Sequence, residues 1–197
     1  MATNILTIFG MICIGLLRLT WAGTDAPNNS TLRQAIALFD AKDYTASQNL
    51  LVQFLDDHRG NATAHYYLGL VYLQTKAYEQ AIEQCHQAVT LQDTEAEHHF
   101  CLGISYGYKA RQAPFWQQAL LAPKIRRALE KAVDLDPSHV QARIGLARFY
   151  LQAPTLLGGD LAKAYQQAET LHSLDASEAR ALMEKIEAAR GFVPSTN

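Results

Sequence analysis

A motif that recurs after 34 residues limits what this chain can fold into more than any other feature of its sequence. A repeat of this length is typical of one supersecondary unit, which cannot bury its apolar face alone and therefore packs against its copies. The recurring residues are Leu68, Gly69 and Tyr72 in one copy and Leu102, Gly103 and Tyr106 in the next, with Tyr44 and Tyr78 at the same separation. We therefore expect stacked copies of one unit within a single domain.

Small residues stand at regular places around the motif and indicate closely packed helices. Glycine or alanine after the motif leucine lets two helices approach, and the following tyrosine fills the space that opens further along. These positions are Gly69, Gly103 and Ala147, with Tyr72, Tyr106 and Tyr150 after them. A second helix would nest on the first through Ala81, Ala88, Ala132 and Ala164.

The order of these residues resembles the tetratricopeptide repeat. Leu68-Gly69-x-x-Tyr72, followed by Ala81, Cys85 and Ala88, matches the leucine-glycine, tyrosine and alanine positions of that family. The resemblance implies an all-α fold, a right-handed superhelical stack of helix-turn-helix hairpins that ends in a C-terminal capping helix. An unrelated helical bundle is the alternative.

The motif positions predict four units between residues 30 and 177. We place the units at 28–61, 62–95, 96–137 and 138–177, with an insertion at 110–123 in the third and an extended loop at 152–160 in the fourth. Within the insertion, Pro114 and Pro123 predict the start and end of a short separate helix. Asp160 is expected to cap the following helix, and Ser177 to cap the final helix at 178–191.

The first 22 residues differ in character from the rest. An apolar run from Ile5 to Leu17 suits the core of a signal peptide and is short for a membrane span. We expect a signal peptide at 1–22 and a linker at 23–29, hence export, with the bacterial periplasm as the destination. The alternative is an inner-membrane anchor at 5–22, and membrane contact is expected through this segment only.

The first helices of such a stack line its concave face, and the resemblance assigns residues to that face. They are apolar or aromatic with few charges, which is typical of a binding surface for another protein or peptide. The assigned groove residues are Leu32, Ile36, Phe39, Tyr66, Leu70, Leu73, Phe100, Ile104, Tyr108, Ile144, Arg148 and Leu151. The alternative is that the superhelix is tight and these residues are core.

The insertion at 110–123 carries an apolar stripe that includes Phe115, Trp116, Leu120 and Leu121. One interpretation makes it a lip on the groove, with Trp116 in contact with the partner. The other makes it a packing element that fills a widened hairpin. If the insertion closed over the groove, the chain would carry a small lipophilic ligand, which is our alternative to protein binding.

Cys85 and Cys101 lie at nearly the same height on adjacent antiparallel helices of the predicted stack. A disulfide is possible if their Cα atoms come within about 7 Å, and two buried thiols are the alternative. The histidines nearby, His65, His86, His98 and His99, do not have the spacing of metal ligands. We predict no metal and no cofactor.

Nothing in the sequence predicts catalysis. It contains no nucleophile motif, no HExxH and no phosphate-binding loop. A net charge of −2 and a pI near 6.4 do not favour nucleic acid, which requires a basic face. We therefore expect a non-enzymatic interaction module.

Overall fold

The computed structural model describes residues 27–191, and within that range the secondary structure is entirely helical. Nine α-helices follow one another, with the short 3-10 helix η1 (Thr155–Leu157) between α7 and α8. The α-helices are α1 (Pro27–Asp40), α2 (Tyr44–Asp57), α3 (Ala62–Gln74), α4 (Tyr78–Leu91), α5 (Ala96–Gln112), α6 (Phe115–Leu135), α7 (Val140–Gln152), α8 (Leu161–Leu171) and α9 (Ala176–Gly191). The predicted all-α fold is confirmed.

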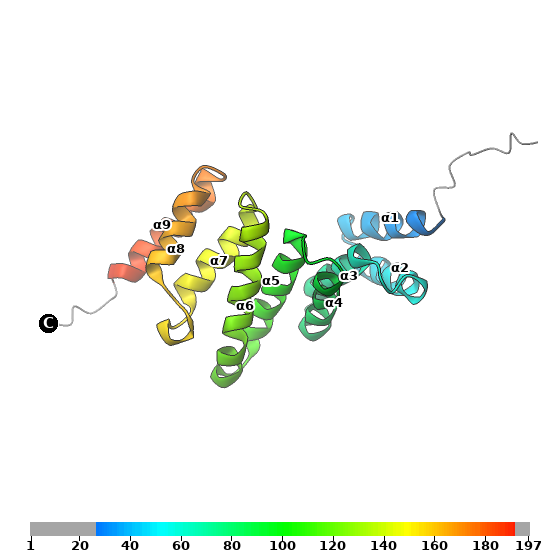
Figure 1. Cartoon of the computed structure of the whole chain (residues 1–197), viewed down its shortest axis with the longest axis horizontal. Coiled ribbons are helices and arrows are strands. Elements are labelled where there is room, and N and C mark those ends of the chain that lie inside the picture. The colour runs from blue at the N-terminus through cyan, green and yellow to red at the C-terminus, as the bar shows by residue number, and fades with distance from the viewer. Residues whose placement is uncertain (1–26, 192–197) are drawn as a thin grey trace, which may run out of the picture.

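The helices form antiparallel hairpins that stack in chain order (Figure 1). In each hairpin an odd-numbered helix packs on the next even-numbered one, from α1 with α2 to α7 with α8. The odd-numbered helices α1, α3, α5, α7 and α9 also contact one another in succession and form one layer. Figure 1 shows α1 and α2 running nearly along the long axis and α5 and α6 running across it. This turning of successive hairpins is that of the predicted right-handed superhelix.

Short polar side chains mark the helix starts, because the first N–H groups of a helix have no partner inside it. Asp43 accepts from the backbone N–H of Ala46 at 3.1 Å, and Asn61 accepts from that of Ala64 at 2.9 Å. The predicted cap Asp160 is confirmed, since it accepts from the N–H groups of residues 162 and 163 at 2.9 and 3.1 Å.

The core consists of apolar clusters between successive hairpins. The predicted small residues of the second helices are fully buried, which lets the helix axes approach closely. These are Ala81, Ala88, Ala132 and Ala164. The last helix, α9, buries Ala179, Leu182 and Ile186 against α7 and α8 and so covers the end of the stack, as predicted.

The predicted helix break at Pro123 is wrong, because α6 runs through it from Phe115 to Leu135. The insertion is not a separate element: residues 110–112 extend α5, and the remainder from residue 115 extends α6. Proline inside a helix loses one backbone hydrogen bond and costs about 3 kcal/mol. Leu121, Ala122 and Ile125 are buried on either side of it, and their burial offsets that cost.

The ends of two other helices differ from the sequence prediction. Helix α1 begins at Pro27, so residues 27–29 of the predicted linker are helical, which suits the preference of proline for the first turn. The final helix begins at Ala176 and is capped by Asp175, not by Ser177. The Asp175 carboxylate accepts from the backbone N–H groups of Ser177 and Glu178, each at 3.1 Å.

The extended connection between α7 and α8 folds back on itself and needs both of its glycines. Gly158 has a φ of +99°, in the left-handed region that favours glycine. A Cβ on Gly159 would overlap the carbonyl of Ala153, so the backbone at residue 159 lies in direct contact with the backbone at residue 153. The loop therefore has a defined shape, and it borders the site described below.

The predicted signal peptide at 1–22, its alternative as an anchor at 5–22, and residues 23–26 of the predicted linker lie outside the described residues. Within residues 27–191, none of the helices combines the length and the apolar character that crossing a membrane requires.

Candidate partner-binding surface

The layer of odd-numbered helices carries the residues predicted to form the groove. Three of them, Leu32, Leu73 and Ile144, are only 7%, 9% and 3% exposed and belong to the clusters between hairpins. Their assignment to an open groove is wrong. The first helix of a stacked hairpin contacts its own second helix and the next hairpin as well, so only a narrow stripe of it stays open.

The other predicted groove residues keep some surface. Tyr108 and Arg148 are exposed, and the half-buried ones are Ile36, Phe39, Tyr66, Leu70, Phe100, Ile104 and Leu151. Phe39 packs on the rings of Tyr44 and Tyr67 at 5.7 and 5.8 Å, so it helps to hold the first two hairpins together.

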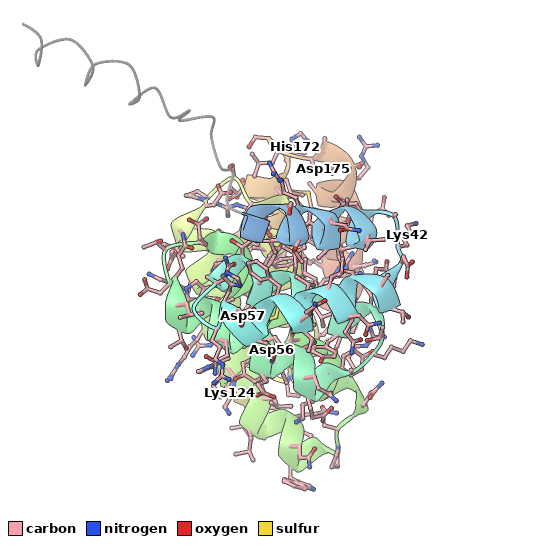
Figure 2. All side chains as sticks on the ribbon, turned by 90° about the vertical axis from the view of Figure 1, so that its right-hand side faces the viewer. Lys42, Asp56, Asp57, Lys124, His172 and Asp175 are labelled. Carbon is pink, nitrogen blue, oxygen red and sulfur yellow. A yellow bond between two sulfur atoms is a disulfide. The ribbon has the colours of Figure 1, made fainter. Side chains whose placement is uncertain are left out.

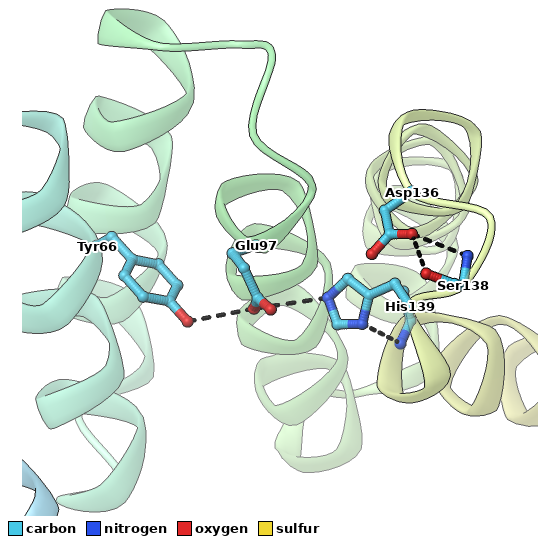
Figure 3. A network of polar contacts seen from close by, with 6 residues as sticks. Tyr66, Glu97, Asp136, Ser138 and His139 are labelled. Atoms are coloured by element: carbon cyan, nitrogen blue, oxygen red, sulfur yellow. Dashed lines mark hydrogen bonds and ion pairs between the residues drawn. The ribbon is translucent and has the colours of Figure 1, made fainter. Parts of the chain in front are cut away.

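A chain of polar contacts crosses three successive first helices (Figure 3). The Tyr66 hydroxyl of α3 donates to Glu97 Oε2 of α5 at 3.2 Å, and His139 Nε2 lies 3.5 Å from the same oxygen. His139 stands at the start of α7, where its Nδ1 accepts weakly from the N–H of Ala142 at 3.4 Å. Its ring also packs on Phe100, at 4.9 Å between centroids. The chain ties three hairpins across the layer of odd-numbered helices.

Burial raises the pKa of the Tyr66 hydroxyl far above its usual value, and the negative charge of Glu97 raises it further. Burial likewise raises the pKa of the neighbouring Tyr67. Both hydroxyls therefore stay protonated at neutral pH and act as hydrogen-bond donors, not as bases or nucleophiles.

An open cavity of about 630 Å³ lies between α5, α6 and α7, closed on one side by the α7–α8 loop. It brings together three of the predicted groove residues, Ile104, Tyr108 and Arg148. Its floor is apolar and includes Ala122, Ile125, Leu129 and Phe149, and its basic side chains are Arg111, Arg148 and Lys185. No acidic residue lines it within the described part of the chain.

The cavity forms where the repeat departs from its own pattern. The residue that corresponds to Leu73 one repeat later is Gly107, and a Cβ there would meet nothing within 4 Å. A Cβ on Gly103, by contrast, would lie 2.8 Å from Leu129, so that glycine serves close helix packing. Sequence reasoning did not identify Gly107 as part of the site, although comparing it with Leu73 would have done so.

The insertion residues do not cover this cavity with their large apolar side chains. Gln118 and Ala122 line it, whereas Phe115, Trp116 and Leu120 are more than half exposed. Of the predicted apolar stripe, only Leu121 packs into the core. The structure thus places Trp116 in solvent.

Cys85 of α4 and Cys101 of α5 are joined by a disulfide, with their Cα atoms 5.7 Å apart. Both are fully buried, beside Ser105 and against Gly69, on which a Cβ would lie 2.6 Å from Cys85 Sγ. The Ser105 hydroxyl donates to the Cys101 carbonyl at 2.7 Å. We call this set, Gly69, Cys85, Cys101 and Ser105, the disulfide interface.

The histidines of this region make structural hydrogen bonds. His65, His98 and His99 each bond the backbone carbonyl of the residue six positions earlier, at 2.9 Å in every case. No group of three or more potential metal ligands occurs among residues 27–191.

Two comparisons, with family models and with solved structures, relate this chain to known proteins. A family model described as tetratricopeptide repeat matches residues 32–96 and 126–169. The gap between the two matched ranges contains most of α5 and the first half of α6, where the third hairpin is widened. A search of curated proteins finds no significant match.

Solved structures share the fold at low sequence identity. A thermophilic tetratricopeptide protein of Thermus thermophilus, TTC0263, is 19% identical, with a TM-score of 0.67 and coverage of 83% of each chain. MamA of Desulfovibrio magneticus is 22% identical, with a TM-score of 0.62 and 76% coverage of each chain. YrrB, described as having an unusual peptide-binding site, is 15% identical, with a TM-score of 0.59 and coverage of 83% of this chain and 86% of its own. At these identities the likeness concerns the fold.

Proposed function

Because the chain belongs to the tetratricopeptide repeat family, we propose that it is a non-catalytic adaptor that binds a segment of a partner protein on the layer of its first helices. The cavity between α5, α6 and α7 carries this proposal. It is the place where exposed predicted groove residues from two successive units, Tyr108 and Arg148, converge on one hollow.

The lining of the cavity indicates what kind of segment it accepts. The cavity has an apolar floor and an open volume of about 630 Å³, which gives room for one or two large side chains. The basic residues Arg111, Arg148 and Lys185 stand around it without an acidic residue in the lining. Arg148 has one weak ion pair, to Glu178 at 3.8 Å, which an incoming carboxylate can replace. The complementary partner segment carries apolar anchors next to acidic side chains.

The polar chain from Tyr66 through Glu97 to His139 extends this surface toward the second unit. Its half-buried aromatic rings, Tyr66 and Phe100, offer flat contact area that costs little conformational entropy on binding. A bound segment that crosses both regions would follow the layer of odd-numbered helices. YrrB, which is similar in fold, is described as having a peptide-binding site, and this agrees with the proposal.

The alternative function, a carrier of a small lipophilic ligand, receives less support. Such a carrier needs a closed apolar chamber. Here three basic residues surround the hollow, and the large apolar residues of the insertion point away from it.

We also propose that the chain is exported, to the bacterial periplasm or held at the inner membrane by residues 5–22. The apolar N-terminal run supports this, and so does the bonded Cys85–Cys101 pair, because disulfides persist in oxidising compartments.

Site-specific photo-cross-linking in the native host tests the proposal. Benzoylphenylalanine in place of Tyr108 would report from the cavity, and the same group in place of Val52 on α2 is the control, since both side chains are 43% exposed. We expect one defined protein product from position 108 that is absent from position 52. Identical products from both positions, or none from position 108, would overturn the proposal.

Variants then test the cavity against the purified partner. Gly107→Leu fills the hollow and should abolish binding, and Arg148→Gln should weaken it about tenfold or more by removing a charged contact. Arg180→Gln on α9 is the matched control, since Arg180 is exposed and does not line the cavity. Equal affinity of all three variants and the wild type would place the partner elsewhere.

A further inference from the structure

The end of the α5–α6 hairpin exposes more apolar side chain than any other part of residues 27–191. Phe115, Trp116 and Leu120 at the start of α6 are 63%, 62% and 63% exposed, and Leu156 of η1 is 91% exposed. We call these four residues the hairpin tip. Large apolar groups gathered in this way are unusual on a protein surface unless they contact something.

The tip is one continuous face. At 100° per residue, Phe115, Trp116 and Leu120 fall within an arc of about 140° on α6, away from the buried Leu121 and Ile125. Leu156 joins them because η1 lies against the same helix, next to Ala119 and Pro123. Figure 1 shows this end of α5 and α6 projecting beyond the turn between α3 and α4.

The charge around the tip has a single sign along the chain. Residues 98–129 contain five basic side chains and no aspartate or glutamate. Lys109 pairs with Glu79 at 3.2 Å and Arg126 with Glu130 at 3.5 Å, so acids from neighbouring segments offset those two charges. Arg111, Lys124 and Arg127 are exposed and have no ion pair within the described residues. Figure 2 shows Lys124 at the side of the projecting hairpin.

The basic side chains stand at a suitable distance behind the apolar ones. At 1.5 Å per residue, Lys124 lies about 6 Å and Arg127 about 10 Å along α6 from Leu120. Amphipathic protein segments bury their apolar groups about 5–10 Å into a bilayer, at the boundary of headgroups and acyl chains. If the tip entered to that depth, Lys124 and Arg127 would lie at the level of the lipid phosphates.

We propose that the hairpin tip inserts into a membrane surface that carries anionic lipids. A projection with apolar residues at its end and cations behind it needs no complementary hollow in its partner, and a lipid surface provides none. A protein partner is less well matched, because binding energy in protein complexes concentrates in packed pockets, whereas the side chains of the tip are each at least 62% exposed. The contact does not rest on the proposed function, although Arg111 also lines the cavity. It adds a second membrane contact to the one expected from the N-terminal segment.

Trp116 itself reports the insertion. The chain has two tryptophans, Trp21 and Trp116, so the full chain carrying Trp21→Phe has a single one, at the tip. We expect its fluorescence to shift to shorter wavelength with phosphatidylcholine vesicles that contain about one-third phosphatidylglycerol, and to be quenched by brominated acyl chains. Any binding through residues 5–17 would leave Trp116 unquenched unless the tip also entered the bilayer.

Two pairs of variants, made in the Trp21→Phe chain, separate the contributions. Phe115→Ser with Leu120→Ser should lower the affinity for vesicles, read from Trp116 fluorescence, about a hundredfold or more. The control, Val52→Ser with Leu91→Ser, changes two exposed apolar residues elsewhere and should leave this affinity unchanged. Arg111→Gln, Lys124→Gln and Arg127→Gln together should weaken it about a hundredfold. Arg33→Gln, Arg59→Gln and Arg180→Gln form the matched control.

Several results would overturn the proposal. One is a Trp116 spectrum that vesicles leave unchanged. A second is equal insertion into pure phosphatidylcholine, because the cations would then play no part. A third is a spectral shift that depends on protein concentration and needs no lipid, which would make the tip a contact between copies of this chain. Circular dichroism and thermal unfolding check that each variant folds, and we expect both to be unchanged because the altered side chains are exposed.

Discussion

The disulfide interface and the cavity are built on the same repeat, yet one is closed and the other open. At the disulfide interface a Cβ on Gly69 would lie 2.6 Å from Cys85 Sγ, whereas at the cavity a Cβ on Gly107 would meet nothing within 4 Å. Leu73 is 9% exposed and helps to close the former, and its counterpart at the cavity is Gly107. The loss of one side chain, together with the longer α5 and α6 of the third hairpin, therefore leaves a hollow where the preceding repeat is packed.

Removing the disulfide should lower stability more than any other change proposed for these two regions. It tests how much the stability of the disulfide interface depends on a covalent bond. Cys85→Ala with Cys101→Ala should lower the free energy of unfolding by about 3 kcal/mol, the loss expected for a loop of 16 residues. Urea unfolding of the oxidised proteins measures this. Wild-type protein in reducing agent should approach the variant, and a wild type unaffected by reductant would show that the bond contributes nothing.

Adding one methyl group should have opposite effects at the two places. Gly69→Ala should lower the free energy of unfolding by about 2 kcal/mol, because the bonded Cys85 sulfur cannot move aside. Gly107→Ala should raise it by about 0.5–1 kcal/mol through better helix propensity in free space. Thermal unfolding of both variants measures these changes. If the free energy of unfolding changed with the same sign in both, the contrast between the packed interface and the open cavity would be wrong.

The wall of the cavity should depend on a local cap more than on deep packing. Asp160→Ala should cost about 1 kcal/mol, because its carboxylate accepts from two N–H groups at the start of α8. Hydrogen exchange of the first turn of α8 should rise, with little change in α3 and α4. A uniform loss of protection from hydrogen exchange across all hairpins would instead mean that the α7–α8 loop is coupled to the disulfide interface.

The smallest effect on stability is expected from the surface ion pair between Glu79 of α4 and Lys109 of α5, the two helices that the disulfide joins. A hydrogen bond from Lys109 lowers the pKa of Glu79, so the pair stabilises the fold above the unfolded pKa of glutamate and is lost as the pH falls through the lower, folded value. Because both groups reach solvent, Lys109→Gln should cost about 0.5 kcal/mol or less at pH 7. The difference from wild type in urea unfolding should vanish once the pH lies below the folded pKa of Glu79, and one that persists would mean that the charge is not responsible.

Sequence reasoning succeeded at several local features, although the predicted cap at Ser177 was wrong because Asp175 caps the final helix. The cap at Asp160 and the helix start after Pro114 depend on a few neighbouring atoms, and both were predicted. The helix break at Pro123 was wrong because Leu121 and Ile125 gain enough from burial to carry the helix through. Leu32, Leu73 and Ile144 were placed in the groove because the family resemblance assigns a face to the first helices without saying how much of that face stays open.

The sequence by itself determined the architecture. The spacing of Leu68, Gly69 and Tyr72 with their copies 34 residues on can bury its apolar residues only in stacked helical hairpins. Only the tertiary structure decided which surfaces remain open. The hollow beside Gly107 and the exposure of Trp116 depend on how far α6 extends and where the α7–α8 loop lies against it. Such exposure is a property of three helices and a loop together, so no single segment of the chain encodes it.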